Sequence, residues 1–276
     1  MFGFLLVFVV SCATTDFVTG SRTRNMYALA EDVKFGEEVQ HESIEEMRKQ
    51  GVPINRDTKR VKQLQDMVQR ITAISHIPDL PYEVNLFETN IVNAMAAPGG
   101  KIIVFSGLYD EKVGIAKTDD EIAAVISHEI AHVTCRHTTE NLTRQALPNL
   151  LLVAAGLYAE IEGSSDIRNA VAATFLLYNG LWLPKYSRTD EAEADRVGLM
   201  YLAKAGYDPR AAPRLWKRVH EKQGSGNALT ALISTHPTNK DRWQNLEKHL
   251  PAAMEEYKAA TGSYPSGYVP GQPISL

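Results

Sequence analysis

The feature that most constrains this chain is the pentapeptide HEIAH at residues 128–132, which lies inside an expected helix. Thr118, followed three residues later by Glu121, forms a capping-box pattern that predicts where this helix begins. Residues four apart lie on one side of a helix, so His128 and His132 can bind one zinc ion. Glu129 is rotated out of the ligand set but can contact a zinc-bound water. The pattern predicts a catalytic zinc centre.

The alternative for this segment is a solvated helix face that carries two incidental histidines. The apolar side chains around the motif oppose that interpretation, because they predict a buried helix: Ile122, Val125, Ile126, Ile130 and Val133. Burying two imidazoles and a carboxylate without a metal would leave costly polar groups. The buried metal-binding helix is therefore the favoured hypothesis.

A catalytic zinc ion needs a third protein ligand and an open position for water. Glu191 and Asp195 lie four apart on an expected helix and share one face. Gly198 lies on the same face, where its lack of a side chain allows another helix to pack closely. Glu191 is the expected third ligand. Asp195 is expected to accept a hydrogen bond from the free ring nitrogen of a zinc-bound histidine. Glu193 is expected to point toward solvent, and a salt-bridged surface helix is the alternative for the whole segment.

Local patterns predict an α+β fold, with a small antiparallel sheet followed by a mainly helical body. The elements expected ahead of Thr118 are helices over 36–50 and 58–75, and strands over 82–87, 91–97 and 101–105. Pro98-Gly99-Gly100 is expected to turn the last two strands into a hairpin. The apolar segments 146–159 and 170–183 are expected to be buried helices, with membrane-facing helices as the second choice.

The N-terminus is similar to the leader of an exported bacterial lipoprotein. Residues 2–10 form an apolar run that is too short to span a bilayer but suits a signal peptide, although no Lys or Arg precedes it. Val9-Val10-Ser11-Cys12 resembles a lipobox, so Cys12 is the expected lipidation site. Ala13 after the cysteine favours the outer membrane, with the protein on the periplasmic side. A buried strand with an ordinary cysteine is the alternative.

Further motifs extend the pattern well beyond the two predicted metal-binding helices. They are Asn93-Ala94-Met95-Ala96, Arg136-His137, Ser187-Arg188, and Ser234-Thr235-His236-Pro237 with Arg242. Together with HEIAH and EAEAD (191–195), they resemble the zinc metallopeptidases that include the CAAX prenyl proteases, HtpX, the Oma-type mitochondrial proteases, and the periplasmic BepA and LoiP proteins. The resemblance covers about residues 30 to 250. It favours the exported lipoprotein (LoiP-like) branch, which lacks tetratricopeptide repeats.

This resemblance implies a gluzincin-type peptidase with one Zn²⁺ ion per chain, held by His128, His132 and Glu191. Glu129 would be the general base. His236 and Arg242 would lie near the zinc. His236 could stabilise the oxyanion or occupy the open zinc position in a resting state. An extended substrate could add to a sheet edge at Asn93, Ala94 and Ala96.

The implied domain organisation is a signal peptide (1–11), a lipid-proximal tether (12–35), a zinc metallopeptidase domain (36–250) and an extended C-terminal tail (251–276). The expected substrates are unfolded or misassembled envelope proteins, and the expected membrane contact is the N-terminal lipid. An envelope chaperone or assembly factor with a latent zinc site is the alternative. The net charge of −4, from 29 Lys and Arg against 33 Asp and Glu, argues against nucleic-acid binding.

Overall fold

The computed structural model describes residues 13–20, 22–145, 186–222, 229–236 and 241–272, together with 274 and 276. Cys12, the proposed signal peptide, and the apolar segments 146–159 and 170–183 lie outside the described residues. The chain divides into two compact units, one of residues 1–28 and 139–182 and the other of residues 29–138 and 183–276. Every residue of the predicted metal centre lies in the second unit.

The first unit contains a short antiparallel hairpin of β1 (Ala13–Thr15) and β2 (Arg22–Arg24). Its turn begins at Asp16, whose Oδ1 accepts a hydrogen bond of 2.9 Å from the amide of Val18. We expected a tether over residues 12–35. The hairpin and the first turns of α1 (Leu29–Lys49) lie in that range instead, because Thr residues favour strands and Asp side chains favour turns.

The second unit is built on a three-stranded sheet in the order β3-β5-β4. The strands are β3 (Glu83–Phe87), β4 (Ala94–Ala97) and β5 (Lys101–Phe105). β4 and β5 form the predicted antiparallel hairpin, with Gly99 of its turn at φ +70°. β3 pairs with β5 in parallel, so the sheet is mixed rather than wholly antiparallel. β-Branched and aromatic content predicts a strand but carries no information on its direction.

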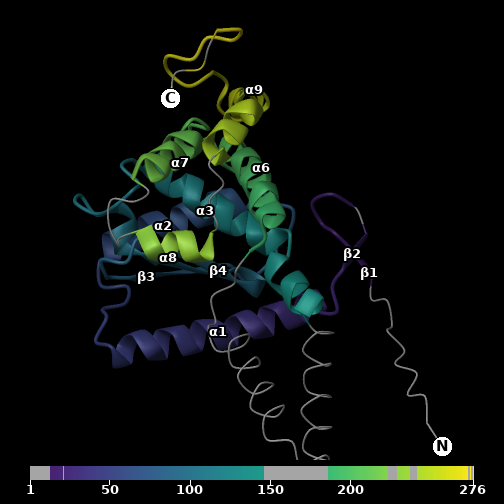
Figure 1. Ribbon diagram of the computed structural model, residues 1–276, viewed down its shortest axis with the longest axis vertical. Helices are drawn as coiled ribbons and strands as arrows, with labels where there is room; N and C mark the ends of the chain where they lie inside the picture. The colour runs from purple at the N-terminus through teal and green to yellow at the C-terminus, as the bar shows by residue number, and fades with distance from the viewer. Residues whose placement is uncertain are drawn as a thin grey trace, which may run out of the picture. The chain divides into compact units, whose positions relative to one another are not determined.

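Helices cover both faces of this sheet (Figure 1). Phe87, Ile103 and Phe105 point to one face and pack against Ile44 and Met47 of α1. The alternate positions point to the other face, where α2 (Thr58–Thr72) contacts β3, and α3 (Asp119–Thr134) contacts β4. Both faces are therefore buried, and α3 is positioned against strand β4 at the edge of the sheet.

The helical body follows the sheet and confirms the predicted α+β class. Its described helices after α3 are α6 (Arg188–Lys204), α7 (Ala211–Lys222), α8 (Thr230–Thr235) and α9 (Arg242–Thr261). The predicted cap of α3 is present, since Thr118 Oγ1 accepts a 3.2 Å hydrogen bond from the Glu121 amide. In the part of the chain that the structure describes, no helix combines the length and apolarity needed to cross a bilayer.

The C-terminal tail begins later than predicted. Helix α9 continues through Pro251 to Thr261 and ends at Gly262, which has φ +85°. A proline inside a helix costs about 3 kcal/mol. Here Leu250, Ala253 and Met254 are all fully buried around it, and their packing outweighs that cost. The predicted extended tail is therefore restricted to the residues after α9.

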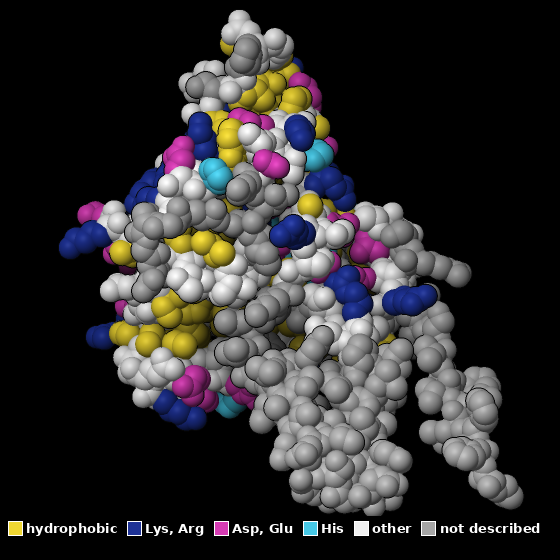
Figure 2. Space-filling view, viewed as in Figure 1, with side chains coloured by type: hydrophobic (Ala, Val, Ile, Leu, Met, Phe, Trp, Pro, Cys, Tyr) yellow, Lys and Arg dark blue, Asp and Glu magenta, His cyan; other side chains and the backbone are white. Residues whose placement is uncertain are grey.

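On the face shown in Figure 2, the described Lys and Arg side chains are interspersed with Asp and Glu rather than gathered in one basic patch. Nucleic-acid binding requires a concentrated basic surface. The face seen here therefore gives no support for such a partner.

Candidate metal centre

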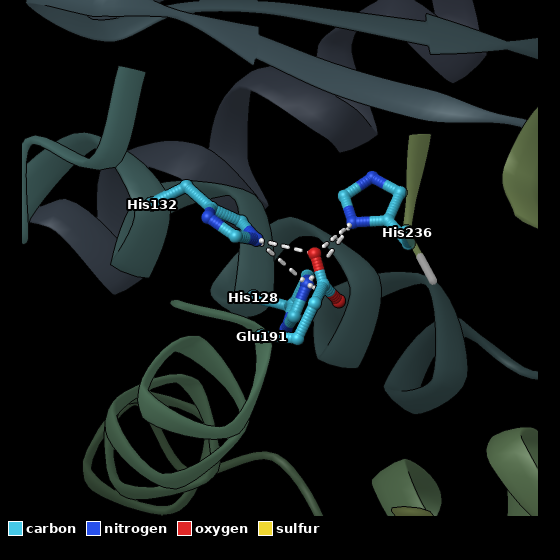
Figure 3. Close-up of side chains that lie close together, drawn as sticks. All are labelled: His128, His132, Glu191 and His236. Carbon is cyan, nitrogen blue, oxygen red and sulfur yellow. Dashed lines mark hydrogen bonds and ion pairs between the residues drawn. The ribbon is translucent and has the colours of Figure 1, made fainter. Parts of the chain in front are cut away.

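Four buried side chains bring their ligand atoms within 4.8 Å of one another: His128, His132, Glu191 and His236. His128 and His132 come from α3, Glu191 from α6, and His236 from the end of α8. His132 Nε2 lies 3.0 Å from His128 Nε2 and 3.4 Å from Glu191 Oε1. Figure 3 shows the Glu191 carboxylate between the rings of His132 and His236. The structure thus brings together all three predicted ligands and one further histidine.

The close approach of α3 and α6 depends on Gly198. A Cβ atom at this position would lie 2.9 Å from the Cα of His128 and 3.0 Å from the carbonyl oxygen of Ser127. Cβ atoms essentially never approach a backbone atom closer than 3.0 Å, so a side chain at this position would force the two helices apart. Glu191 lies on the same helix face, two turns earlier, and this approach brings it to His128 and His132.

Arg242 and Asp195 contact the ligands Glu191 and His128 and orient them. The Arg242 guanidinium donates two hydrogen bonds to Asp195, of 2.8 Å from Nε and 2.7 Å from Nη2, and its Nη1 lies 2.8 Å from Glu191 Oε2. Asp195 Oδ1 lies 3.1 Å from Nδ1 of His128. Asp195 is therefore at Nδ1 of His128, while Nε2 faces the other ligands His132 and Glu191.

The charges of this group depend on Arg242. Burial opposes ionisation of Glu191, but Arg242 and then His236 hold the pKa of its carboxyl well below its ordinary value. The guanidinium is itself buried and lies over the indole of Trp216, with Cζ 3.3 Å from the ring centroid. Glu191 is therefore an anion that can bind a cation at neutral pH.

Glu129 is the side chain whose surroundings fit a catalytic rather than a structural site. It is 1% exposed, and its Oε2 has no hydrogen-bond partner among the described residues. Its Oε1 lies 3.3 Å from His236 Nε2, and burial raises the pKa of its carboxyl. Two imidazoles and a carboxylate are the ligand set of catalytic zinc, and a buried carboxylate oxygen beside them suits a water molecule. The residues present therefore fit a zinc ion.

The side of His132 away from the metal carries contacts that sequence reasoning missed. Its ring stacks on Tyr186, with centroids 3.7 Å apart, and its Nδ1 lies 2.8 Å from Nδ1 of His137. Nε2 of His137 in turn lies 3.4 Å from Glu193 Oε2. Glu193 is therefore not directed wholly to solvent as predicted, because its long side chain turns back to the buried imidazole. The pair Arg136-His137 directly after the motif helix was the available signal for His137.

The predicted substrate-binding segment lies beside this centre. Ala94 and Ala96 belong to β4, which is an edge strand of the sheet. Asn93 precedes the strand, and its Oδ1 accepts a 3.5 Å hydrogen bond from Thr235 Oγ1, next to His236. A small hollow adjoins His128 and Glu129 and is lined largely by apolar side chains that include Val125, Leu215, Trp216 and Leu232.

The fold and the donor set are those of a zinc metallopeptidase. Residues 58–250 match the family model of peptidase family M48, and the chain belongs to this family.

Several curated relatives share most of the matched region. The chain is 35% identical over 188 residues to the mitochondrial metalloendopeptidase OMA1 of Schizosaccharomyces pombe, which covers 68% of this chain and 52% of that protein. It is 41% identical over 172 residues to OMA1 of Arabidopsis thaliana, an alignment that covers 62% of this chain and 32% of that protein. It is 24% identical over 200 residues to the beta-barrel assembly-enhancing protease of Escherichia coli, an alignment that covers 69% of this chain and 39% of that protein. The chain thus spans about half or less of the length of these relatives.

Proposed function

We propose that this chain is a zinc-dependent endopeptidase that hydrolyses peptide bonds with a water molecule activated by Glu129. The observation that carries the proposal is the buried Oε2 of Glu129, which lies beside the three ligands and has no hydrogen-bond partner within the described part of the chain. A bound zinc ion would supply Lewis acidity, which polarises the scissile carbonyl and lowers the pKa of water. Glu129 would take the proton of the attacking water and pass it to the leaving amine.

The other residues of the site would position the reactants. Asp195 would keep the proton of His128 on Nδ1, so that Nε2 stays available to the metal. An extended peptide would add to the edge strand β4 beside Ala94 and Ala96, because an unpaired strand edge offers backbone hydrogen bonds to any sequence. The apolar hollow next to Glu129 favours a hydrophobic side chain near the cleaved bond.

We further propose that the protein acts in the bacterial cell envelope, on unfolded or misassembled envelope proteins. Support comes from the lipobox pattern at Cys12 and from the name of the Escherichia coli relative, which refers to assembly of β-barrels. Such barrels occupy bacterial outer membranes. A lipid on Cys12 would hold the enzyme at the periplasmic side of a membrane. Cys12→Ala should abolish incorporation of a labelled fatty acid, and label retained by this variant would contradict lipidation.

Hydrolysis of casein by the purified full chain tests the activity. Cleavage should stop when a chelator removes the metal and return when one equivalent of zinc is added. Activity that survives complete metal removal would contradict the proposal. The substrate class is tested separately in cells, where Glu129→Gln should retain bound substrates and co-purify with envelope proteins.

The second candidate function is an envelope chaperone or assembly factor whose zinc site is latent. One observation favours it, since Nδ1 of His236 lies 3.0 Å from Glu191 Oε1 and 3.4 Å from His128 Nε2. His236 would then fill the position that a catalytic zinc site leaves open for water. This candidate predicts a zinc-loaded protein that prevents aggregation of an unfolded client but does not cleave casein.

A further inference from the structure

A second group of potential ligand atoms lies on the far side of His132. Cys135, His137 and Glu193 each offer one atom within 4.8 Å of the other two, and Cys135 and His137, which follow α3, are buried. The Glu193 side chain is 30% exposed, so the group can be reached from solvent. Thiolate and imidazole are donors that zinc and softer divalent ions prefer, and zinc also accepts a carboxylate oxygen.

The backbone holds Cys135 and His137 in place through an unusual turn. Arg136 between them has φ +57°, in the left-handed region that residues other than glycine rarely adopt. Its guanidinium makes two buried hydrogen bonds to Asp32, of 2.6 Å from Nε and 2.9 Å from Nη2. This anchor keeps the turn closed, and the turn presents Cys135 and His137 to Glu193 of α6. Backbone strain of this kind persists where surrounding contacts over-determine it.

The predicted zinc ligands and this second group of ligand atoms are linked by the proton between His132 and His137. When Nε2 of His132 binds a metal, its single proton is on Nδ1, which then donates to Nδ1 of His137 over 2.8 Å. His137 must therefore keep its own proton on Nε2, facing Glu193. A metal at Nε2 of His137 would force this proton to Nδ1, where two N–H groups would face each other. Filling the second group would therefore break the hydrogen bond that orients His132.

We propose that Cys135, His137 and Glu193 form a second binding site for a thiophilic divalent ion such as Zn²⁺ or Cd²⁺, and that filling this site weakens zinc binding at the first. On binding, the Cys135 thiol loses its proton to solvent, while His137 keeps one proton, moved from Nε2 to Nδ1. The inference concerns metal binding alone, so it stands or falls independently of the proposed peptidase activity.

The test uses the full chain with Cys12→Ser, so that Cys135 is the remaining thiol, loaded with one equivalent of Zn²⁺ and titrated with Cd²⁺. A thiolate-to-cadmium charge-transfer absorption should grow and saturate at one equivalent. Transfer of the first zinc to a chromophoric chelator should become faster by about 10–100-fold, the usual cost of losing an outer partner of a metal-bound histidine.

The matched control adds Cys135→Ser, which replaces the thiol by a hydroxyl of similar size. This variant should still bind one zinc, and Cd²⁺ should no longer accelerate zinc release. The proposal is wrong if Cys135 gives no charge-transfer absorption, or if zinc release is accelerated equally in the serine variant. Absorption without faster zinc release would disprove the coupling. If Cys135→Ser does not fold, Glu193→Gln should weaken cadmium binding, and unchanged cadmium affinity would disprove the three-ligand site.

Discussion

His128 lies between the carboxylates of Asp195 and Glu191, which counteract the effect of burial on its pKa. Burial and the nearby Arg242 lower the pKa of His128, but hydrogen bonds to Asp195 and Glu191 outweigh them and raise it from 6.5 to about 9. The metal-free imidazole is therefore protonated at neutral pH. Zinc needs the lone pair of Nε2, so the ion must displace one proton when it binds.

This proton makes zinc binding depend on pH. Below the raised pKa of His128, zinc affinity should increase with pH by about tenfold per unit, with about one proton released per ion, and the increase should end near pH 9. Isothermal titration in two buffers of different ionisation enthalpy measures the released proton. Zinc binding without proton release at neutral pH would show that His128 is already neutral.

Glu191 and Glu193, two residues apart on α6, should differ sharply in their effect on zinc. Glu191→Ala removes a ligand, so the protein should lose its metal. Glu193→Ala removes only the carboxylate beside His137, so one zinc should remain, bound about 10-fold more weakly. Metal analysis after dialysis, together with a chelator titration, separates the two. Equal zinc retention by both variants would contradict Glu191 as the third ligand.

His236 should restrain the enzyme rather than support it. Its Nδ1 is among the ligand atoms, where it would block access of water to the metal. His236→Ala should keep one zinc and cleave casein about 10-fold faster, if the blocked state is favoured by about 1.4 kcal/mol. An oxyanion-stabilising role would instead lower the rate by about 10²–10³-fold. Zinc content and cleavage rate, measured on the same sample, distinguish the two roles.

At the scale of secondary-structure elements, the metal centre depends on how closely α6 approaches α3. Gly198→Ala would place a methyl group against the backbone of His128. Overpacking of this kind costs about 1–3 kcal/mol of unfolding free energy, and here it should also move Glu191 away from the histidines. We expect lower thermal stability together with weaker zinc binding.

A substitution on the exposed side of the same helix serves as the control. Ala192→Ser should change the unfolding free energy by about 0.5 kcal/mol or less and leave zinc affinity unchanged. Denaturant unfolding and chelator competition measure both quantities. Wild-type zinc affinity in Gly198→Ala would show that α6 can shift without disturbing the ligands.

Among the secondary-structure elements, the sequence predicted local structure better than it predicted how strands pair. The capped helix at Thr118 and the β4–β5 hairpin are confirmed, because capping and turn signals are local. The parallel pairing of β3 with β5 was not predicted, since strand direction is set by the path of the whole chain. The extended tail that was predicted from residue 251 begins only after Thr261, because tertiary packing of α9 outweighs the local penalty of Pro251.

At the scale of the whole molecule, the centre joins residues that are far apart in the chain. His128 and Glu191 could be named from the sequence because their residue types and helical spacing suit a zinc ion, whereas His236 could be named only through the family resemblance. The contacts of His132 with Tyr186 and His137, and of Arg242 with Trp216, could not be named. They depend on side-chain directions across packed elements, which a one-dimensional pattern does not contain.

In the proposed function, Glu129 activates water beside a zinc ion held by His128, His132 and Glu191. The most direct test measures zinc content and casein hydrolysis of Glu129→Gln, which keeps the size of the side chain but removes its basicity. We expect one zinc per chain, as in the wild type, and a rate lower by about 10²–10⁴-fold. A zinc-loaded Glu129→Gln protein that cleaves casein at the wild-type rate would contradict it.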